Sequence, residues 1–129
     1  MRDIEVVPFE MHKHYAVVAM WWEAHGQAPI PVELLPRLGF FVASTCAGFL
    51  YQTDSGVAIM EGLISSPESH PQKRDEALDA VTEALCAEAQ KLGFHVVYGF
   101  TSNARVSTRG QRLGFNLQPD TFSLLTRRV

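Results

Sequence analysis

The chain has 129 residues, of which 47% are hydrophobic and 19% are charged, and its formal net charge is −3. This length fits a single domain over residues 1–129, and the composition excludes a disordered chain. The slightly acidic balance gives no basis for non-specific nucleic-acid binding, and no apolar run approaches the ~18 residues of a membrane-spanning helix. The charged opening lacks the apolar run of a signal peptide, so we expect a cytoplasmic protein.

The first third of the chain predicts a strand, a helix and a loop. Residues 4–9 have the composition of a strand, and Pro8 restricts it to a sheet edge or a strand end. Apolar residues recur with helical spacing over 11–25, and Gly26 ends that helix. The adjacent Trp21 and Trp22 do not share one helical face, so one is expected in the core and the other in an acceptor groove or an oligomer contact. Three prolines make 27–39 a loop with one helical turn at most.

Three strand-like segments follow, with the sequences FFVAST, AGFLYQ and VAIMEGLI, and TDSG forms a hairpin turn between the last two. A polar break, SSPESHPQ, then leads into the longest predicted helix, residues 72–92. Its apolar residues form one stripe, and Gly93 occupies the position of a left-handed cap. Ser69 and Gln72 have the spacing of a capping box at its start.

The segment HVVYGF after this helix predicts a buried strand. Residues 57–100 therefore form a strand–helix–strand unit, whose strands should pair in parallel through a right-handed crossover. Residues 103–113 predict a short helix that ends at Gly114. Residues 116–128 supply one or two final strands around a Pro119–Asp120 turn. The fold class is α/β in the broad sense (α+β), with a mixed sheet.

Cysteine and histidine patterns argue against a metal site. Cys46 and Cys86 lie far apart in apolar segments, without the paired ligands of a zinc site or the cationic neighbour of a reactive thiol. Both are expected to be reduced packing residues. No two histidines have metal-ligand spacing on one face. His70 lies in the loop before the long helix, where either contact with a phosphate or a surface position is open.

Three local patterns carry a family resemblance. They are VAIMEGLISSP before the long helix, QKRDEA at its start, and N-x10-GF formed by Asn103, Gly114 and Phe115. In this order they resemble the GNAT superfamily of acyl-CoA-dependent N-acyltransferases, over nearly the whole chain. The resemblance implies a mixed central sheet of about six to seven strands flanked by about four helices. More narrowly, WWEAHGQAPIPVELLP and AGFLYQTDS resemble small GNAT-like proteins carried by tailed bacteriophages.

The resemblance implies acetyl-CoA, or another acyl-CoA, as co-substrate. A helix N-terminus offers unpaired N–H groups and partial positive charge to a pyrophosphate. Asp75 stands where the family has glycine, and the alternative for this segment is an ordinary capped helix whose acidic residues offset the helix dipole. The resemblance places the pantetheine arm along the strand before the helix. The residues expected to bind the cofactor are Leu63, Ile64, Ser65, Gln72, Lys73, Arg74, Asp75, Glu76, Ala77 and Asn103.

The resemblance makes Glu61 the candidate base that deprotonates an attacking amine, and an edge-facing or ion-paired glutamate is the alternative. The family commonly places a tyrosine acid seven residues after the asparagine of its final helix, but this chain has Gly110 there, facing inward and leaving a gap. Tyr98 or Ser107 are candidates to replace that acid. Three functions stay open: an N-acyltransferase for an unidentified amine, a non-catalytic module that binds a protein partner in a phage or prophage setting, and acyl-CoA binding without turnover.

Arg105, Arg109 and Arg112 form a basic stripe on the last helix. A solvated face explains the stripe, and the 3′-phosphate of CoA or an acidic partner are its alternatives. No aromatic residues alternate with these arginines, so nucleic acid is not an expected partner. The expected partners are the acyl-CoA and an amine-bearing acceptor, with a homodimer left open and no membrane association.

Overall fold

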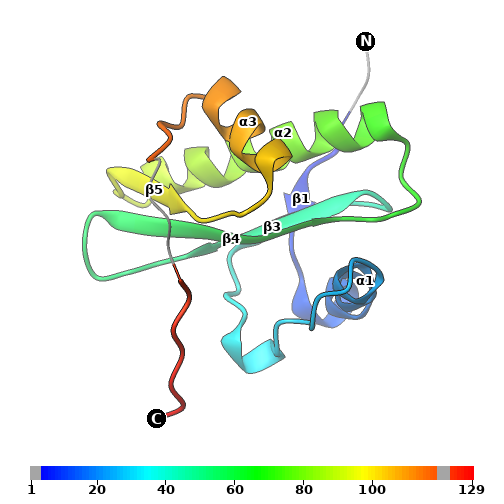
Figure 1. The fold of residues 1–129 in the computed structure, drawn as a ribbon, viewed down its shortest axis with the longest axis horizontal. Helices are drawn as coiled ribbons and strands as arrows, with labels where there is room; N and C mark the ends of the chain where they lie inside the picture. The colour runs from blue at the N-terminus through cyan, green and yellow to red at the C-terminus, as the bar shows by residue number, and fades with distance from the viewer. Residues whose placement is uncertain (1–3, 119–122) are drawn as a thin grey trace.

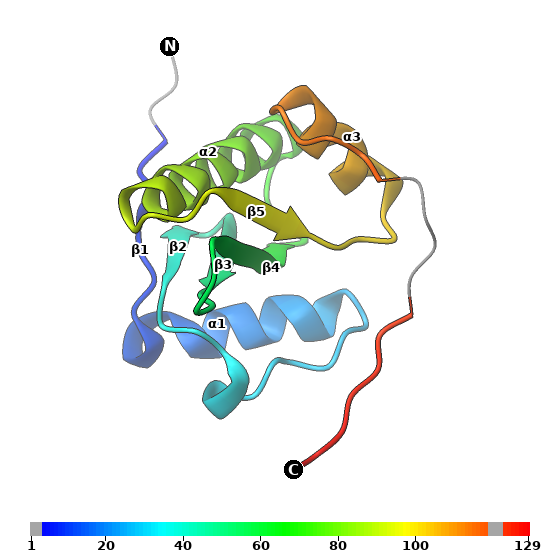
Figure 2. The ribbon, with the colours of Figure 1, turned by 90° about the vertical axis from the view of Figure 1, so that its left-hand side faces the viewer.

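The computed structural model describes residues 4–118 and 123–129, and its core is one sheet between two layers of helices (Figures 1 and 2). Helices α2 and α3 cover one face of the sheet, and α1 with the short 3-10 helix η1 covers the other (Figure 2). In chain order the elements are β1 (Val7–Pro8), α1 (Met11–Ala24), η1 (Val32–Leu34), β2 (Gly39–Val42), β3 (Cys46–Tyr51), β4 (Val57–Ser65), α2 (Pro71–Lys91), β5 (Val96–Gly99) and α3 (Ala104–Arg112).

The strands follow one another across the sheet in the order β1-β2-β3-β4-β5. The first three pairings are antiparallel, and β4 pairs with β5 in parallel. Because α2 connects these two parallel strands, the predicted parallel strand–helix–strand unit is confirmed. The expectation that its second strand is buried is wrong, because β5 lies at the sheet edge and is largely exposed. The mixed α+β class predicted from the sequence is confirmed as well.

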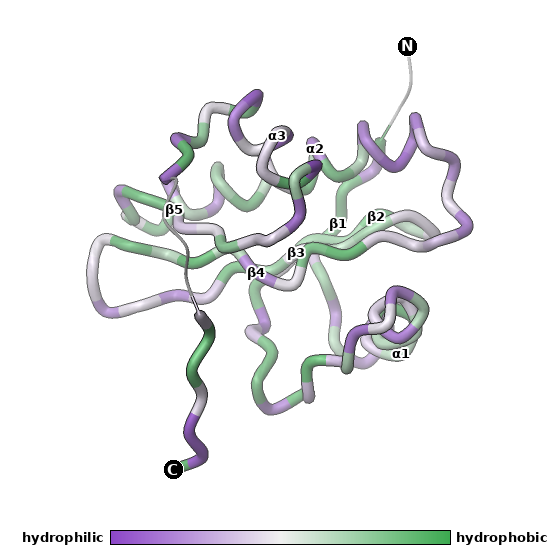
Figure 3. Tube along the Cα trace, viewed as in Figure 1, coloured by the Kyte–Doolittle hydropathy of each residue, from purple (hydrophilic) through white to green (hydrophobic). Residues whose placement is uncertain are grey.

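The numbers of strands and helices are lower than predicted. The described residues contain five strands, three α-helices and one 3-10 helix, against an expected six to seven strands and about four helices. The expected final strands are absent from 116–118 and 123–129, and the Pro119–Asp120 turn lies outside the described residues. Leu124 and Leu125 are 90% exposed, although they form a hydrophobic stretch in this tail (Figure 3). A strand needs a neighbour for its backbone groups, and this segment runs clear of the sheet (Figure 1).

Two apolar clusters form the core, one on each face of the sheet. The cluster on the α1 side includes both tryptophans, so the expectation that only one would be buried is wrong. Trp21 stacks on Phe41 with ring centroids 5.7 Å apart, and Trp22 packs against Phe49 at 6.1 Å. Each indole is wide enough to reach the sheet from its own side of the helix. The cluster on the α2 side contains Cys46, as the sequence predicted.

The ends of α2 are only partly as predicted. Gly93, with φ +92°, follows the last residues of the helix as the left-handed cap that the sequence indicated. The predicted capping box is wrong, because the N-cap is His70, whose Nδ1 accepts from the Gln72 N–H at 3.2 Å. The Ser69 hydroxyl instead donates back to the Ser66 carbonyl at 2.6 Å. The His70 imidazole therefore accepts the hydrogen bond from the Gln72 N–H that the Ser69 hydroxyl was expected to accept.

His14 gives the α1 side of the core a dependence on pH. Its ring stacks on Phe41 at 4.0 Å, and its Nδ1 accepts from the Glu10 N–H at 2.9 Å. Burial lowers the pKa of His14 below 6.5, so the unfolded chain binds the proton first as pH falls. We expect the contribution of His14 to the free energy of unfolding to be steady above pH 6.5 and to fall below it. Urea midpoints between pH 7.5 and 5 measure this, and His14→Phe should reduce the fall more than His12→Gln does.

Candidate functional site

The long strand β4 continues past the end of β5, and this makes a fork in the sheet. Residues Val57–Met60 of β4 pair with Val96–Gly99 of β5, whereas 61–65 have β3 on one side only. In Figure 1, β5 accordingly lies beside one end of β4. Within the described residues, the β5-side edge of 61–65 has no strand partner. An extended chain with its own amide groups fits such an edge.

A bulge in β4 sets the directions of the side chains at the fork. Between the pairs Phe49–Glu61 and Ala47–Ile64, β3 advances by two residues and β4 by three. Gly62 lies in this bulge with φ +73°, a backbone conformation that favours glycine. The extra residue interrupts the alternation of side chains. Ile64 therefore packs into the α1-side cluster, and Leu63 packs against the α2-side cluster.

Glu61 lies at the fork, on the α1 side of the sheet, and is exposed. Its Oε1 accepts from the Gly62 N–H at 3.2 Å. The neighbouring Tyr51 phenol donates to the Leu34 carbonyl at 2.9 Å, which ties the η1 segment to the strands beside Glu61. Burial raises the pKa of Tyr51, and the negative charge of Glu61 raises it further. The carboxylate is therefore open to solvent and to a ligand that approaches this face.

The connection from β4 to α2 is held by hydrogen bonds at several points. The Ser66 N–H donates to the Thr45 carbonyl at 2.7 Å, and the Ser66 hydroxyl accepts from the Glu68 N–H at 3.3 Å. The Ser65 carbonyl bonds to Nε2 of His25, at the end of α1, at 2.9 Å. Since Ser65 already has this partner, any pairing of a ligand with the strand edge rests mainly on Leu63 and Ile64.

The first turns of α2 bring most of the predicted cofactor residues next to the end of β4. Gln72 and Asp75 are exposed, and Arg74 is half-buried. Ala77 is fully buried in the α2-side cluster, so its methyl group serves packing against the sheet. Glu76 is half-buried on the same turn. The backbone at this helix start and the strand edge of β4 are thus joined by the short connection 66–70.

Asp75 belongs to an ion-pair network between α2 and α3. Its Oδ1 accepts from Nη2 of Arg109 at 3.0 Å, and Asp79 accepts from Nη2 of Arg112 at 2.9 and 3.0 Å. Nε of Arg109 lies 3.3 Å from Asp79, a charge contact without hydrogen-bond geometry. The Arg109 side chain is only 13% exposed, so the expectation of a solvated stripe is wrong for this residue. Arg105 is exposed.

We expect Arg109→Gln to destabilise the protein by about 1–2 kcal/mol, because it leaves two carboxylates of α2 without their shared cation. The effect should shrink at high salt, since Asp75 is largely exposed. Urea unfolding at low and high ionic strength measures both. Arg105→Gln, on an exposed site of the same helix, is the matched control and should change stability by less than about 0.5 kcal/mol. Equal effects of the two substitutions would contradict this role for Arg109.

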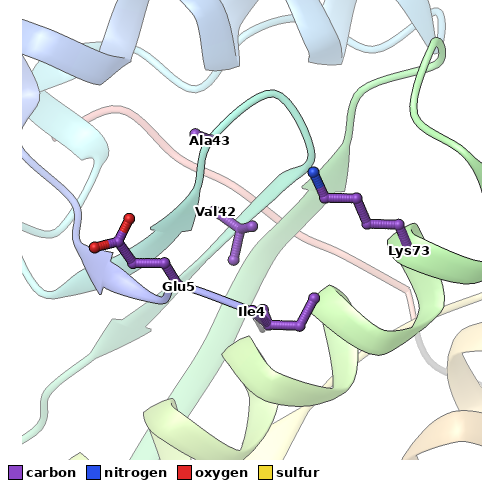
Figure 4. A pocket seen from close by; sticks show the side chains of 5 residues that line it. All are labelled: Ile4, Glu5, Val42, Ala43 and Lys73. Atoms are coloured by element: carbon purple, nitrogen blue, oxygen red, sulfur yellow. The ribbon is translucent and has the colours of Figure 1, made fainter. Parts of the chain in front are cut away.

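Lys73 lies apart from the strand edge. It lines a hollow of about 200 Å³ together with Ile4, Glu5, Val42 and Ala43 (Figure 4). This hollow lies between the start of the described chain, the β2–β3 turn and α2. A residue two positions from Asp75 points to a different side of a helix, which explains why Lys73 and Asp75 have different neighbours.

Asn103 caps α3, and Phe115 lies beside Gly110 of the same helix. The Asn103 Oδ1 caps the helix by accepting from the N–H groups of Arg105 at 2.8 Å and Val106 at 3.3 Å. A Cβ at Gly110 would lie 3.6 Å from the Cβ of Phe115. This is an ordinary van der Waals distance, so Phe115 borders the position without excluding a Cβ, and the gap beside Gly110 stays a prediction.

Two contacts of the candidate site were not predicted from the sequence. They are the His25 bond to the Ser65 carbonyl and the pairing of Arg109 with Asp75. The helical spacing of Asp75 and Asp79 on one helix and of Arg109 and Arg112 on the next was the available signal for the second. Nothing in the local sequence indicated the bond between His25 and the Ser65 carbonyl.

The described part of the chain contains no cluster of three or more histidine, cysteine or acidic side chains placed to hold a metal ion. Among its helices, none is long and apolar enough to span a bilayer. The burial of Cys46 raises the pKa of its thiol to about 12. Burial also raises the pKa of Cys86, and the negative charge of Glu83 adds a smaller increase. Both thiols fit the predicted packing role.

No protein-family model and no curated protein matches the sequence. Solved structures do match, over nearly the whole chain. An acetyltransferase of Trypanosoma brucei has a TM-score of 0.69 at 14% identity, covering 96% of this chain and 100% of that one. Glucosamine-6-phosphate N-acetyltransferase from Arabidopsis thaliana has a TM-score of 0.69 at 8% identity, covering 98% and 100%. A transcriptional regulator from Bacillus halodurans has a TM-score of 0.67 at 11% identity, covering 96% and 100%.

At these identities the likeness establishes the fold, which is that of the GNAT acetyltransferases, as the sequence predicted. The matches do not support the narrower resemblance to proteins carried by bacteriophages.

Proposed function

We propose that the protein is an acyl-CoA-dependent N-acyltransferase that transfers an acetyl or related acyl group to an amine. The observation that carries the proposal is the fork between β4 and β5. It leaves the β5-side edge of 61–65 without a strand partner within the described residues. This edge begins at the exposed Glu61 and leads through the connection 66–70 to the first turn of α2. An extended pantetheine chain fits the strand edge. A pyrophosphate fits the partial positive charge of a helix start, although at α2 the N–H groups of Gln72 and Arg74 already donate to His70.

In this proposal the backbone of Leu63 and Ile64 pairs with the pantetheine arm, and Ser65 lies at its far end. The first turn of α2 receives the pyrophosphate, with the side chains of Gln72 and Arg74 beside it, and the buried Ala77 supports this turn by packing on the sheet. Asp75 does not oppose that anion strongly, because Arg109 offsets its charge at 3.0 Å. The proposal does not depend on Lys73 or Asn103, whose side chains have structural neighbours of their own.

Glu61 is the proposed base. It accepts a proton from the amine, directly or through a water molecule, as the nitrogen bonds to the thioester carbonyl carbon. The carbon–sulfur bond then breaks, and the sulfur leaves as a thiolate. Since a free thiol has a pKa of about 8.5, the thiolate is a tolerable leaving group, and it takes its proton from solvent or from a donor such as Tyr98 or Ser107. No phenol at position 110 is needed for this sequence of bond changes.

Thermal unfolding with acetyl-CoA tests the binding part of the proposal. At a ligand concentration near 100 Kd, the folded state should gain about 2.7 kcal/mol. Adenosine 3′,5′-bisphosphate, which lacks the pyrophosphate and the pantetheine arm, is the matched control and should stabilise less. An unchanged unfolding midpoint at millimolar acetyl-CoA would contradict the proposal.

A second candidate is a non-catalytic module with the GNAT fold that binds a protein partner, in a phage or prophage setting. It is favoured by Gly110, which stands where the family commonly has a catalytic tyrosine, and by Asp75, which stands where the family has glycine. Binding of acyl-CoA without turnover is the intermediate case. Absence of an acetyl-CoA shift selects the partner-binding module, and a shift without thiol release in the presence of amines selects the intermediate case.

A further inference from the structure

The sheet face around Glu61 carries aromatic rings to which the proposed function assigns no role in binding the acceptor. Cross-strand pairing places Glu61 beside Phe49, Ile59 beside Tyr51, and Tyr98 beside Ile59, so these side chains share the α1 side of the sheet. Tyr98 is 49% exposed and Phe100 is 53% exposed. We call Tyr98 and Phe100 the aromatic pair.

The aromatic pair has a defined geometry. Its ring centroids lie 6.3 Å apart with planes at 87°, an edge-to-face contact. Helix α1 covers the other end of this sheet face, away from β5 (Figure 1). The rings of the aromatic pair are therefore half open on the same face as the Glu61 carboxylate.

The loop after α1 adds an apolar rim to this face. A Cβ at Gly62 would lie 3.4 Å from Cδ1 of Ile30, so Ile30 reaches the bulge next to Glu61. The Tyr15 phenol donates to the Ile30 carbonyl at 2.8 Å and holds the loop. Leu34, 61% exposed, is tied through its carbonyl to Tyr51. The loop thus brings the Ile30 side chain to the bulge next to Glu61.

Charge on this face also points to a class of ligand. The side chains brought together here are aromatic or aliphatic, with the Glu61 carboxylate among them. The cations that the structure ties to α2 and α3, Arg109 and Arg112, lie on the opposite face of the sheet. An ammonium group is attracted by the carboxylate and by ring faces, whereas a phosphate group on the acceptor would be repelled by the carboxylate.

We propose that the acceptor is a small primary amine that carries an aromatic or branched aliphatic group. Its ammonium group lies toward Glu61, and its apolar group packs on Tyr98 and Phe100. This inference rests on the proposed acyltransferase function, and it identifies the aromatic pair as the residues that select the acceptor. Burying an aromatic group against the pair supplies binding energy in proportion to the apolar area removed from water.

Binding of phenethylamine, followed by ligand-observed NMR without any acyl-CoA, tests the inference apart from turnover. Tyr98→Ser should raise its Kd at least tenfold, whereas Tyr98→Phe, which keeps the ring, should leave it within about twofold. Leu92→Ser, at an exposed apolar site at the end of α2, is the control and should have no effect. Phe100→Ser should act in the same direction as Tyr98→Ser. Equal Kd values for the wild type and Tyr98→Ser would overturn the inference.

Two further measurements separate the competing explanations. Glucosamine 6-phosphate that binds more tightly than phenethylamine would overturn the acceptor class. Light scattering that shows a dimer in the wild type and a monomer in Tyr98→Ser would mean that a second copy covers the aromatic pair, which also overturns it. An acetyl-CoA shift without preference for aromatic amines rejects only this inference. Absence of the acetyl-CoA shift rejects the proposed function itself.

Discussion

Glu61→Gln should lower the rate of acyl transfer at least 100-fold while leaving the thermal shift produced by acetyl-CoA unchanged. A positioned general base typically contributes about 10²–10⁴-fold to rate, and the amide keeps the shape of the side chain without its basicity. Release of free CoA thiol with a saturating amine measures the rate. Because Glu61 is exposed, the substitution should change the free energy of unfolding by less than about 0.5 kcal/mol.

Glu23→Gln is the matched control for this experiment. Glu23 is also exposed, but it lies near the end of α1 and not at the fork. Its substitution should leave both the rate and the thermal shift at wild-type values. Similar rates for Glu61→Gln and the wild type would remove Glu61 from the mechanism while leaving acyl-CoA binding untouched.

Gly62→Ala should destabilise the protein and also reduce acyl transfer, because it strains the bulge that directs Glu61. A left-handed backbone costs an alanine about 1–2 kcal/mol relative to glycine. The added Cβ at position 62 would also lie 3.0 Å from Cδ2 of Phe49, a ring that is fully buried and has little room to move. We therefore expect a loss in the free energy of unfolding of about 2–3 kcal/mol.

Gly93→Ala separates backbone strain from the local clash. Gly93 also has a positive φ, +92°, but a Cβ there meets no atom within 4 Å. Its substitution should cost only the backbone term, about 1–2 kcal/mol, and should not affect acyl transfer. If the two alanine variants lost equal stability and kept equal activity, the bulge would have no special role at the fork.

The helices were predictable because their signals are local. Apolar spacing over 11–25 and 72–92 and the glycines after each segment describe contacts within one helix or with one sheet face. The parallel pairing of β4 and β5 followed from the helix between them, since a crossover connection permits that arrangement. These features depend on neighbours that are close in sequence.

The features that were missed depend on residues distant in sequence. The bulge at Gly62 was hidden because the β4 sequence is apolar on both faces, so one extra residue leaves no break in the pattern. The pairing of Arg109 with Asp75 requires α3 to lie against the first turns of α2, whereas the spacing within each helix indicates only that each helix has a charged face. The expected final strands failed for the same reason, because a strand-like composition does not supply a partner edge.

Hydrogen exchange with and without saturating acetyl-CoA tests the central claim most directly, because it reports on the backbone of the fork itself. We predict that amides of 61–65 and of the first turns of α2 exchange more slowly with the ligand, whereas those of β2 keep their rates. Unchanged exchange over 61–65 at a ligand concentration that protects other parts of the chain would contradict pairing of an acyl-CoA with this strand edge.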